Sequence, residues 1–180
     1  EGVAGIVNSP PKPNRVGVVA RDYCDQDLDE KLNKIVDELL SKLVVFQERL
    51  KARDPVKAKT KRRISSGLRE VMRSIRIKDA KVIIVAPNIE PGPSEGSLDE
   101  KVKDIIDGAK GAGVPLVFAL SRSKLGKALG KAMRMSAAVV HSVEGVHETY
   151  KEMLELTATL RHSFQERQRA EARKALAPSR

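Results

Sequence analysis

The chain has 180 residues, a net charge of +10 and a pI near 9.8, so we expect one domain with extensions and a polyanionic partner. Aromatic residues make up 3% and tryptophan is absent, which disfavours a single-strand binder built on aromatic stacking platforms. A single cysteine excludes an intramolecular disulfide and leaves a cysteine-based zinc site unsupported, and no apolar run approaches the ~20 residues of a membrane span.

Residues 1–26 are expected to form an extended arm that packs on the domain. Three prolines between positions 10 and 13 prevent a regular helix in this segment. The first residue is Glu rather than Met, which indicates a piece of a longer protein, and the segment has no signal-peptide pattern.

A long helix is predicted over residues 27–53. Asp27 and Glu30 have the spacing of a capping box, and Asp54-Pro55 ends the helical pattern. The helix carries one apolar stripe, which we expect to pack on the domain rather than on a separate partner. The stripe consists of Leu28, Leu32, Ile35, Val36, Leu39, Leu43, Phe46 and Leu50.

A basic run then leads into a second helix, a turn at Lys78-Asp79 and a strand over 82–86. Residues 51–63 hold seven Lys/Arg and one Asp, which fits a basic binding face as well as a solvated surface. The helix is predicted to bury one face and expose the other. Its inward residues are Ile64, Leu68, Val71, Met72 and Ile75, and its outward residues are Ser66, Arg69, Glu70 and Arg73.

The outward face begins beside Gly67, near the start of this helix. Glycine costs a helix about 1 kcal/mol relative to alanine, so its position predicts a close approach to the backbone. Helix-start N–H groups and the preceding cations favour phosphate. Glu70 in this positive region fits a group that accepts hydrogen bonds from base edges, and it fits equally well a surface ion pair with Arg73.

Strands and helices alternate through the rest of the chain, which predicts a three-layer α/β/α sandwich. Further strands are expected over 115–120 and 137–141, and further helices over 97–113, 123–131 and from 146 onward. Ser97 and Glu100 have capping-box spacing, and Gly111 and Gly113 are expected to end their helix. The last helix is predicted to bury Tyr150, Met153, Leu154, Thr157, Leu160 and Phe164, followed by a solvated tail over 166–180 that frays or remains helical.

No catalytic or cofactor-binding pattern is evident. His141, His147 and His162 do not have metal-ligand spacing, and no local motif assembles a nucleophile with a base. The segment 124–131 lacks Walker A spacing, and Gly126, one helical turn before a second glycine, permits close packing or approach of RNA. We therefore expect a non-enzymatic protein without cofactor or metal.

The segment GLREVMR, residues 67–73, resembles the G-x-N-E-x-x-K motif of the L7Ae/L30e kink-turn RNA-binding proteins. Gly67, Glu70 and Arg73 match the motif, and Arg69 stands at the asparagine position, as in the branch of the family that binds the selenocysteine insertion sequence (SECIS). DPVKAKTKRR, VIIVAPN, GVPLVFAL and SRSKLGKAL are also similar to that branch, in the same order. The resemblance covers roughly residues 20–165. It implies an L7Ae/L30e-like RNA-binding domain over 54–165 with a small mixed sheet.

The resemblance also implies an RNA site. Glu70 would accept from guanine N–H groups of tandem sheared G·A pairs, Gly67 would allow backbone approach, and basic residues would contact base edges or phosphates. Met133 and Met135, after the short helix, would cover an extruded base, although core filling is an equally good reading. The expected basic residues are Lys59, Lys61, Arg62, Arg63, Arg69, Arg73, Arg122, Lys124 and Arg134.

By resemblance, the chain would bind SECIS RNA in the 3′ untranslated region of selenoprotein mRNAs. It would act in the cytoplasm, with possible nuclear shuttling, as a monomer with the selenocysteine-specific elongation factor and the ribosome. Other hypotheses are a ribosomal or small nucleolar ribonucleoprotein component that binds different kink-turns, the RNA-binding appendage of an RNA-modifying enzyme, and a protein-interaction domain with a solvated basic face.

Overall fold

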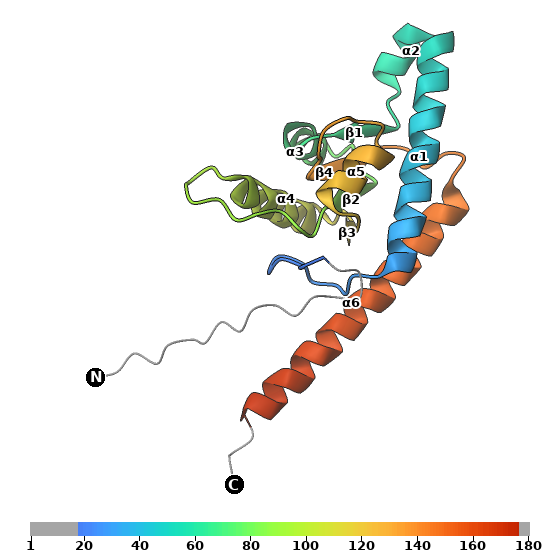
Figure 1. Ribbon diagram of the computed structural model, residues 1–180. Helices are drawn as coiled ribbons and strands as arrows, with labels where there is room; N and C mark the ends of the chain where they lie inside the picture. The colour runs from blue at the N-terminus through green and yellow to red at the C-terminus, as the bar shows by residue number, and fades with distance from the viewer. Residues whose placement is uncertain (1–17, 177–180) are drawn as a thin grey trace.

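A four-stranded mixed sheet lies at the centre of the computed structural model, which describes residues 18–176 (Figure 1). The strands β1 (Ile64–Ser66), β2 (Val82–Val85), β3 (Leu116–Phe118) and β4 (Ala137–Val140) are ordered β1-β4-β2-β3. β2 and β3 are parallel, and β4 is antiparallel to both of its neighbours. Every residue of β2, β3 and β4 is buried, as expected when helices cover both faces of a sheet.

Helices pack on both faces of this sheet. α3 contacts α4, β1 and β4, whereas α1 contacts α5, α6 and β1. The predicted three-layer α/β/α sandwich with a small mixed sheet is therefore confirmed. The helices are α1 (Glu30–Arg53), α2 (Pro55–Thr60), α3 (Leu68–Arg76), α4 (Leu98–Ala112), α5 (Arg122–Ala128) and α6 (His147–Leu176).

Five residues of the predicted apolar stripe are buried in α1: Leu32, Ile35, Val36, Leu39 and Leu43. Phe46 and Leu50 are half-buried, and Leu28 is half-buried before the helix begins. The cap of the helix is not Asp27. Asp29 caps α1, and its Oδ1 accepts from the backbone N–H of Lys31 at 2.7 Å and of Leu32 at 3.2 Å. At Asp27 the chain still runs along α6, where the Asp27 carboxylate pairs with Arg167. The helix therefore begins two residues later than the capping-box spacing predicts.

The segment 64–67 is wrongly predicted as helix. Ile64 to Ser66 pair with β4, and the N–H of Gly67 extends the pairing by donating to the carbonyl of Ala137 at 3.1 Å. Gly67 has φ = +103°, so the chain turns sharply there before α3 begins. Val71 and Ile75 are buried as predicted, and Ile64 is buried from the strand instead.

Ser97 is the N-cap of α4, but the predicted capping box does not form. The Ser97 hydroxyl donates to Asp99 Oδ1 at 2.7 Å, and the Glu100 carboxylate accepts from the N–H of Gly96 rather than that of Ser97. Gly113 ends the helix in the left-handed conformation, with φ = +69°, as predicted.

α6 runs to Leu176, and its second half projects away from the sheet (Figure 1). Of its six predicted inward residues only Met153 and Thr157 are buried, and the others are half-buried because one side of the helix there meets solvent. From residue 166 the described helix is exposed, which is one of the two expected forms of this segment. Residues 177–180 of the expected tail and 1–17 of the expected arm lie outside the described residues.

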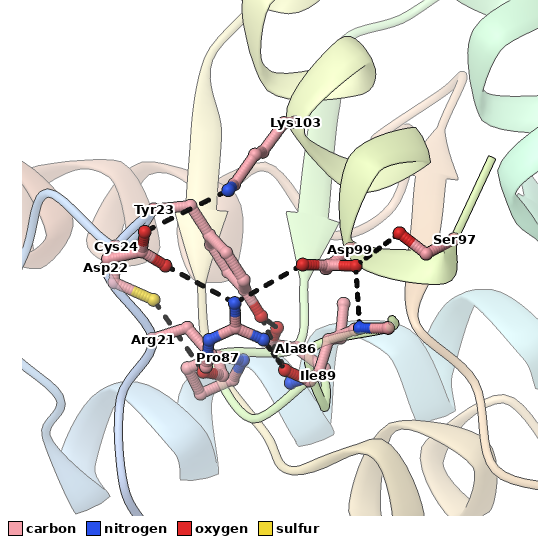
Figure 2. Close-up of polar contacts among 11 residues, drawn as sticks. Arg21, Asp22, Tyr23, Cys24, Ala86, Pro87, Ile89, Ser97, Asp99 and Lys103 are labelled. Carbon is pink, nitrogen blue, oxygen red and sulfur yellow. Dashed lines mark hydrogen bonds and ion pairs between the residues drawn. The ribbon is translucent and has the colours of Figure 1, made fainter. Parts of the chain in front are cut away.

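The segment over 18–29 contacts the loop after β2 and the edge of the sheet. Figure 2 shows the contacts of Arg21, Tyr23 and Cys24 with that loop. The Tyr23 hydroxyl donates to the carbonyl of Ala86 at 2.8 Å, and the backbone N–H of Arg21 donates to that of Pro87 at 3.0 Å. The amide of Gln26 pairs with both the N–H and the C=O of Phe118, each at 3.0 Å. Gln26 thus takes the place of a further strand beside the edge strand β3.

Cys24, in this segment, is expected to react slowly with alkylating agents. Its side chain is buried, and burial raises the pKa of the thiol to about 12, so little thiolate forms at neutral pH. Alkylation at pH 8 should be at least about tenfold slower in native than in urea-unfolded protein. Because the folded pKa is raised, this thiol contributes stability below its unfolded pKa, near 9, and that stability declines as the pH rises above it. Equal native and unfolded alkylation rates would contradict the packing of this segment.

Candidate nucleic-acid interface

A basic cleft of about 800 Å³ lies between α2 and α3, beside the edge strand β1. Seven Lys/Arg side chains line it, against three carboxylates, so the cleft is suited to a polyanion. The structure here brings together six of the predicted site residues: Lys59, Lys61, Arg62, Arg63, Glu70 and Arg73. The remaining lining residues are Leu50, Arg53, Lys57, Thr60, Ser65, Ser74, Ile77, Asp79, His141, Ser142 and Glu144.

The basic wall of the cleft depends on the break between α1 and α2. Asp54 ends α1 and caps α2, and its carboxylate accepts from the N–H of Lys57 at 3.0 Å. Pro55 occupies the first turn of α2, where a missing N–H costs nothing. The short helix buries Ala58 and leaves Lys57 and Lys59 exposed to the cleft.

Gln47 of α1 fixes the point where the chain leaves this wall and enters β1. Its Oε1 accepts from the N–H groups of Arg63 at 3.0 Å and of Ile64 at 3.2 Å. The guanidinium of Arg63 lies over the ring of Phe46, 5.2 Å from its centroid, and donates to the carbonyl of Glu144. These two contacts orient the guanidinium of Arg63, and one of its N–H donors is already used by the Glu144 carbonyl.

The start of α3 is open. No side chain caps it, so the first-turn N–H groups and the positive end of the helix dipole remain available to an anion. A Cβ added at Gly67 would meet nothing within 4 Å. The glycine is therefore required by the positive φ of the turn, and the space above it fits the predicted approach of another molecule to the backbone.

Glu70 lies in the first turn of α3, at the junction of two hollows. It lines the basic cleft and also a smaller hollow of about 250 Å³, which it shares with Arg62, Ser66 and Lys131. Within residues 18–176, no Lys or Arg nitrogen lies within 4.0 Å of the Glu70 carboxylate. The alternative that Glu70 serves an ion pair with Arg73 is therefore not what the structure shows.

Three polar side chains meet at the floor of the cleft. The ring of His141, just after β4, places Nε2 at 2.9 Å from the Ser65 hydroxyl. Its Nδ1 lies 2.6 Å from the backbone oxygen of Asp79 and 3.2 Å from the Asp79 carboxylate. The contacts link β1, β4 and the loop before β2, and no sequence motif contained them.

The loop after α5 packs back onto that helix. A Cβ at Gly126 would lie 2.2 Å from the carbonyl oxygen of Met133, so Gly126 serves close packing within the protein. The side chain of Met133 is 70% exposed, whereas Met135 is half-buried against the core. Met133 is therefore free to contact a ligand, as one of the two predicted roles requires, whereas Met135 packs against the core, as the other requires. Arg134 is exposed beside them.

Three further predicted residues do not line the basic cleft: Arg69, which is exposed on α3, Arg122 and Lys124. Lys124 is 3.9 Å from Glu30 and lines a different hollow, toward α1. The backbone N–H of Arg122 donates to Asn88 Oδ1 at 3.0 Å, and its carbonyl accepts from the N–H of Met135 at 3.1 Å. Its buried Nε has no hydrogen-bond partner in the described structure.

Sequence reasoning missed Arg53, Lys57, Ser65 and His141 as members of the site. The first two belong to the basic run over 51–63, whose charge count was a usable signal. Ser65 and His141 are 76 positions apart and meet only through the pairing of β1 with β4, so no local pattern identifies them.

Among residues 18–176, no group of three or more His, Cys, Asp and Glu side chains is placed to hold a metal ion. In the same part of the chain, no helix has the length and apolarity to cross a membrane.

Comparison with known proteins identifies the family. The model of the ribosomal protein L7Ae/L30e/S12e/Gadd45 family matches residues 49–150. Selenocysteine insertion sequence-binding protein 2 of Rattus norvegicus is 43% identical over 144 residues, which cover 80% of this chain and 17% of that protein. Selenocysteine insertion sequence-binding protein 2-like of Mus musculus is 36% identical over 146 residues, covering 81% of this chain and 13% of that protein.

The fold has a counterpart among solved structures. The Giardia lamblia 15.5kD RNA binding protein superposes with a TM-score of 0.56 at 18% identity, covering 73% of this chain and 92% of its own. The chain spans about a sixth of the length of the first curated relative named above. It belongs to the ribosomal protein L7Ae/L30e/S12e/Gadd45 family.

Proposed function

We propose that this chain binds the kink-turn of SECIS elements in the 3′ untranslated regions of selenoprotein mRNAs. The observation that carries the proposal is the placement of Glu70. Its carboxylate has no cation within 4.0 Å in the described structure, although it stands in a cleft lined by seven basic side chains. The relatives named for SECIS binding, which align with four-fifths of the chain, support the choice of RNA.

The chemistry of this cleft fits a bent RNA better than a regular duplex. A-form RNA hides base edges in a deep, narrow major groove, so sequence-specific proteins bind kinks, bulges and loops. A carboxylate accepts hydrogen bonds only, and guanine offers imino and amino donors. Glu70 therefore reads the sheared G·A pairs, and the phosphates lie at the uncapped start of α3 beside Gly67.

The basic side chains divide into two groups in this proposal. Arg69 and Arg73, on the exposed face of α3, contact base edges or phosphates nearest to Glu70. Lys59, Lys61 and Arg62 contact the phosphate backbone along the cleft, with Arg63 oriented by its contact with Phe46.

A second contact lies at the loop after α5. The exposed side chain of Met133 covers an extruded base, and Arg134 contacts phosphate beside it. Arg122, Lys124 and Met135 support this region from α5 and the loop. Lys124 reaches RNA only if it leaves its contact with Glu30.

In this proposal, RNA binding supports selenocysteine incorporation at UGA codons through the selenocysteine-specific elongation factor and the ribosome. The chain has no enzymatic part in that process. α1 and the segment over 18–29 belong to the same module, since both pack on the sheet.

A competition experiment tests the proposal. Labelled SECIS stem-loop is bound to the chain at near-physiological salt, and unlabelled SECIS, a ribosomal-type kink-turn and a plain duplex are added as competitors. We expect SECIS to compete at least about tenfold better than the other kink-turn and about a thousandfold better than the duplex. Equal competition by both kink-turns would favour a general kink-turn binder, and equal competition by the duplex would contradict the proposal.

Lys61→Ala is expected to weaken binding to all RNAs alike and to reduce the salt slope by about one unit. Lys61 is exposed at the cleft, and a lysine that neutralises one phosphate releases about one counterion. The measurement is the logarithm of the binding constant against the logarithm of salt concentration. Lys151→Ala, an exposed lysine on α6, serves as the control and should leave the slope unchanged. A change in the preference for SECIS over duplex would contradict a phosphate-only role for Lys61.

A further inference from the structure

We propose that the Ser65 hydroxyl is a further RNA-reading group, and that His141 positions it as a hydrogen-bond acceptor beside Glu70. This inference rests on the proposed function, because it concerns the same bound RNA. The Ser65 oxygen would accept a hydrogen bond from the RNA, donated by a base amino group or by a ribose 2′-hydroxyl.

The contacts of His141 determine which ring nitrogen carries the proton. Nδ1 lies 2.6 Å from the backbone oxygen of Asp79, and a carbonyl oxygen can only accept, so Nδ1 is the donor. In the neutral imidazole Nε2 is then an acceptor. In this tautomer the Ser65 hydroxyl, 2.9 Å away, donates its hydrogen to Nε2.

With its hydrogen committed to His141, the Ser65 oxygen presents only lone pairs to its other neighbours. Ser65 is half-buried and lines both the basic cleft and the smaller hollow, as Glu70 does. Two acceptors thus stand at the junction of the two hollows, in a cleft whose charged side chains are mainly cationic. Such a pair selects RNA donors and gives no advantage to a phosphate, which has only acceptors.

The hydrogen bonds among Ser65, His141 and Asp79 join three parts of the fold. β1 supplies Ser65, the turn after α3 supplies Asp79, and His141 follows the last residue of β4. The backbone N–H of His141 donates to the carbonyl of Arg63 at 2.8 Å, which fixes the main chain that carries the ring, and the ring itself is held by its contacts with Asp79 and Ser65.

The first test compares Ser65→Ala with wild type on chemically modified RNA. We expect Ser65→Ala to lose about fivefold in affinity for the native SECIS stem-loop, the value of one hydrogen bond. Single guanine-to-inosine changes remove a base amino group, and single 2′-deoxy changes remove a ribose hydroxyl. One single modification, from either the inosine set or the 2′-deoxy set, should lower the affinity of the wild type about fivefold. The same modification should leave the affinity of Ser65→Ala unchanged. Ser163→Ala, an exposed serine on α6, is the matched control and should bind as wild type.

The second test addresses the positioning role of His141. His141→Gln keeps an oxygen that can accept from Ser65, whereas His141→Leu has a similar size and no acceptor. We expect His141→Leu to lose about threefold in affinity for the SECIS stem-loop, and His141→Gln to stay within about twofold of the wild-type affinity. Urea unfolding of both variants shows whether either one is destabilised. Equal losses for Gln and Leu that follow their stabilities would overturn the positioning role.

Two failures can be told apart. If wild type prefers native SECIS over RNA with Watson-Crick pairs in place of the G·A pairs, but Ser65→Ala matches wild type on every RNA, only this inference is overturned. If wild type shows no such preference, the proposed function fails, and the role of Ser65 fails with it.

Discussion

Replacing Glu70 by alanine is expected to weaken binding to a SECIS kink-turn by about 1–3 kcal/mol, or roughly 5- to 150-fold. The carboxylate is the strongest acceptor at the junction of the two hollows, and no protein cation within 4.0 Å satisfies it in the described structure. Its removal takes away the group that reads guanine donors and leaves the basic wall intact. Binding to a plain duplex should therefore remain within about twofold, or become slightly tighter, because one negative charge is lost.

The control for this variant is Glu90→Ala, which removes an exposed carboxylate from the loop after β2. It should leave both affinities unchanged. Glu70→Gln keeps the size of the side chain but replaces one acceptor oxygen by a donor, so it should lose nearly as much as alanine. If Glu70→Ala lowered SECIS and duplex binding by the same factor, Glu70 would not be reading base edges.

Gly126→Ala is expected to destabilise the fold by about 1–3 kcal/mol. The added Cβ would stand 2.2 Å from the carbonyl oxygen of Met133, and a backbone atom cannot move aside as the end of a flexible side chain can. The loop after α5 must therefore shift as a whole. Urea unfolding measures the effect, and RNA binding by the folded fraction shows whether displacing Met133 weakens the second contact.

Gly111→Ala is the matched control, since it makes the same chemical change in a helix. Nothing lies within 4 Å of the added Cβ, and alanine has the higher helix propensity, so the variant should gain about 0.5–1 kcal/mol. Opposite signs for the two variants are the expected result. Stabilisation by Gly126→Ala would show that the loop does not pack on α5 in solution.

The sequence predicted the fold well where one period dominates over a long stretch. The long apolar stripe predicted one helix and the fully apolar run over 82–86 predicted one strand, and both are observed as α1 and β2. Five of the eight stripe residues are buried in α1. It failed at Ile64, which is four residues before Leu68. That spacing fits a helix, but it also fits a strand and a helix joined by a turn. The positive φ of Gly67 separates the strand from the helix, and the pairing of residues 64–67 with β4 is a tertiary contact that local spacing does not contain.

The candidate site divides in the same way. The basic run and the motif around Glu70 are contiguous in sequence, and they line one cleft. His141 reaches the cleft only because β4 pairs with β1, and Lys124 lies outside the cleft because α5 packs on α1. Charge and spacing along the chain predict which residues are available for a site, whereas the sheet topology decides which of them meet.

The decisive experiment for kink-turn recognition compares the affinities of the wild-type chain for two RNAs. One RNA is a SECIS stem-loop, and the other is the same stem-loop with its tandem G·A pairs converted to Watson-Crick pairs, both at fixed near-physiological salt. We expect the conversion to lower the affinity by about 100-fold or more, because the bend and the guanine donors disappear together. Equal affinities would mean that the cleft binds RNA by charge alone, which contradicts the account.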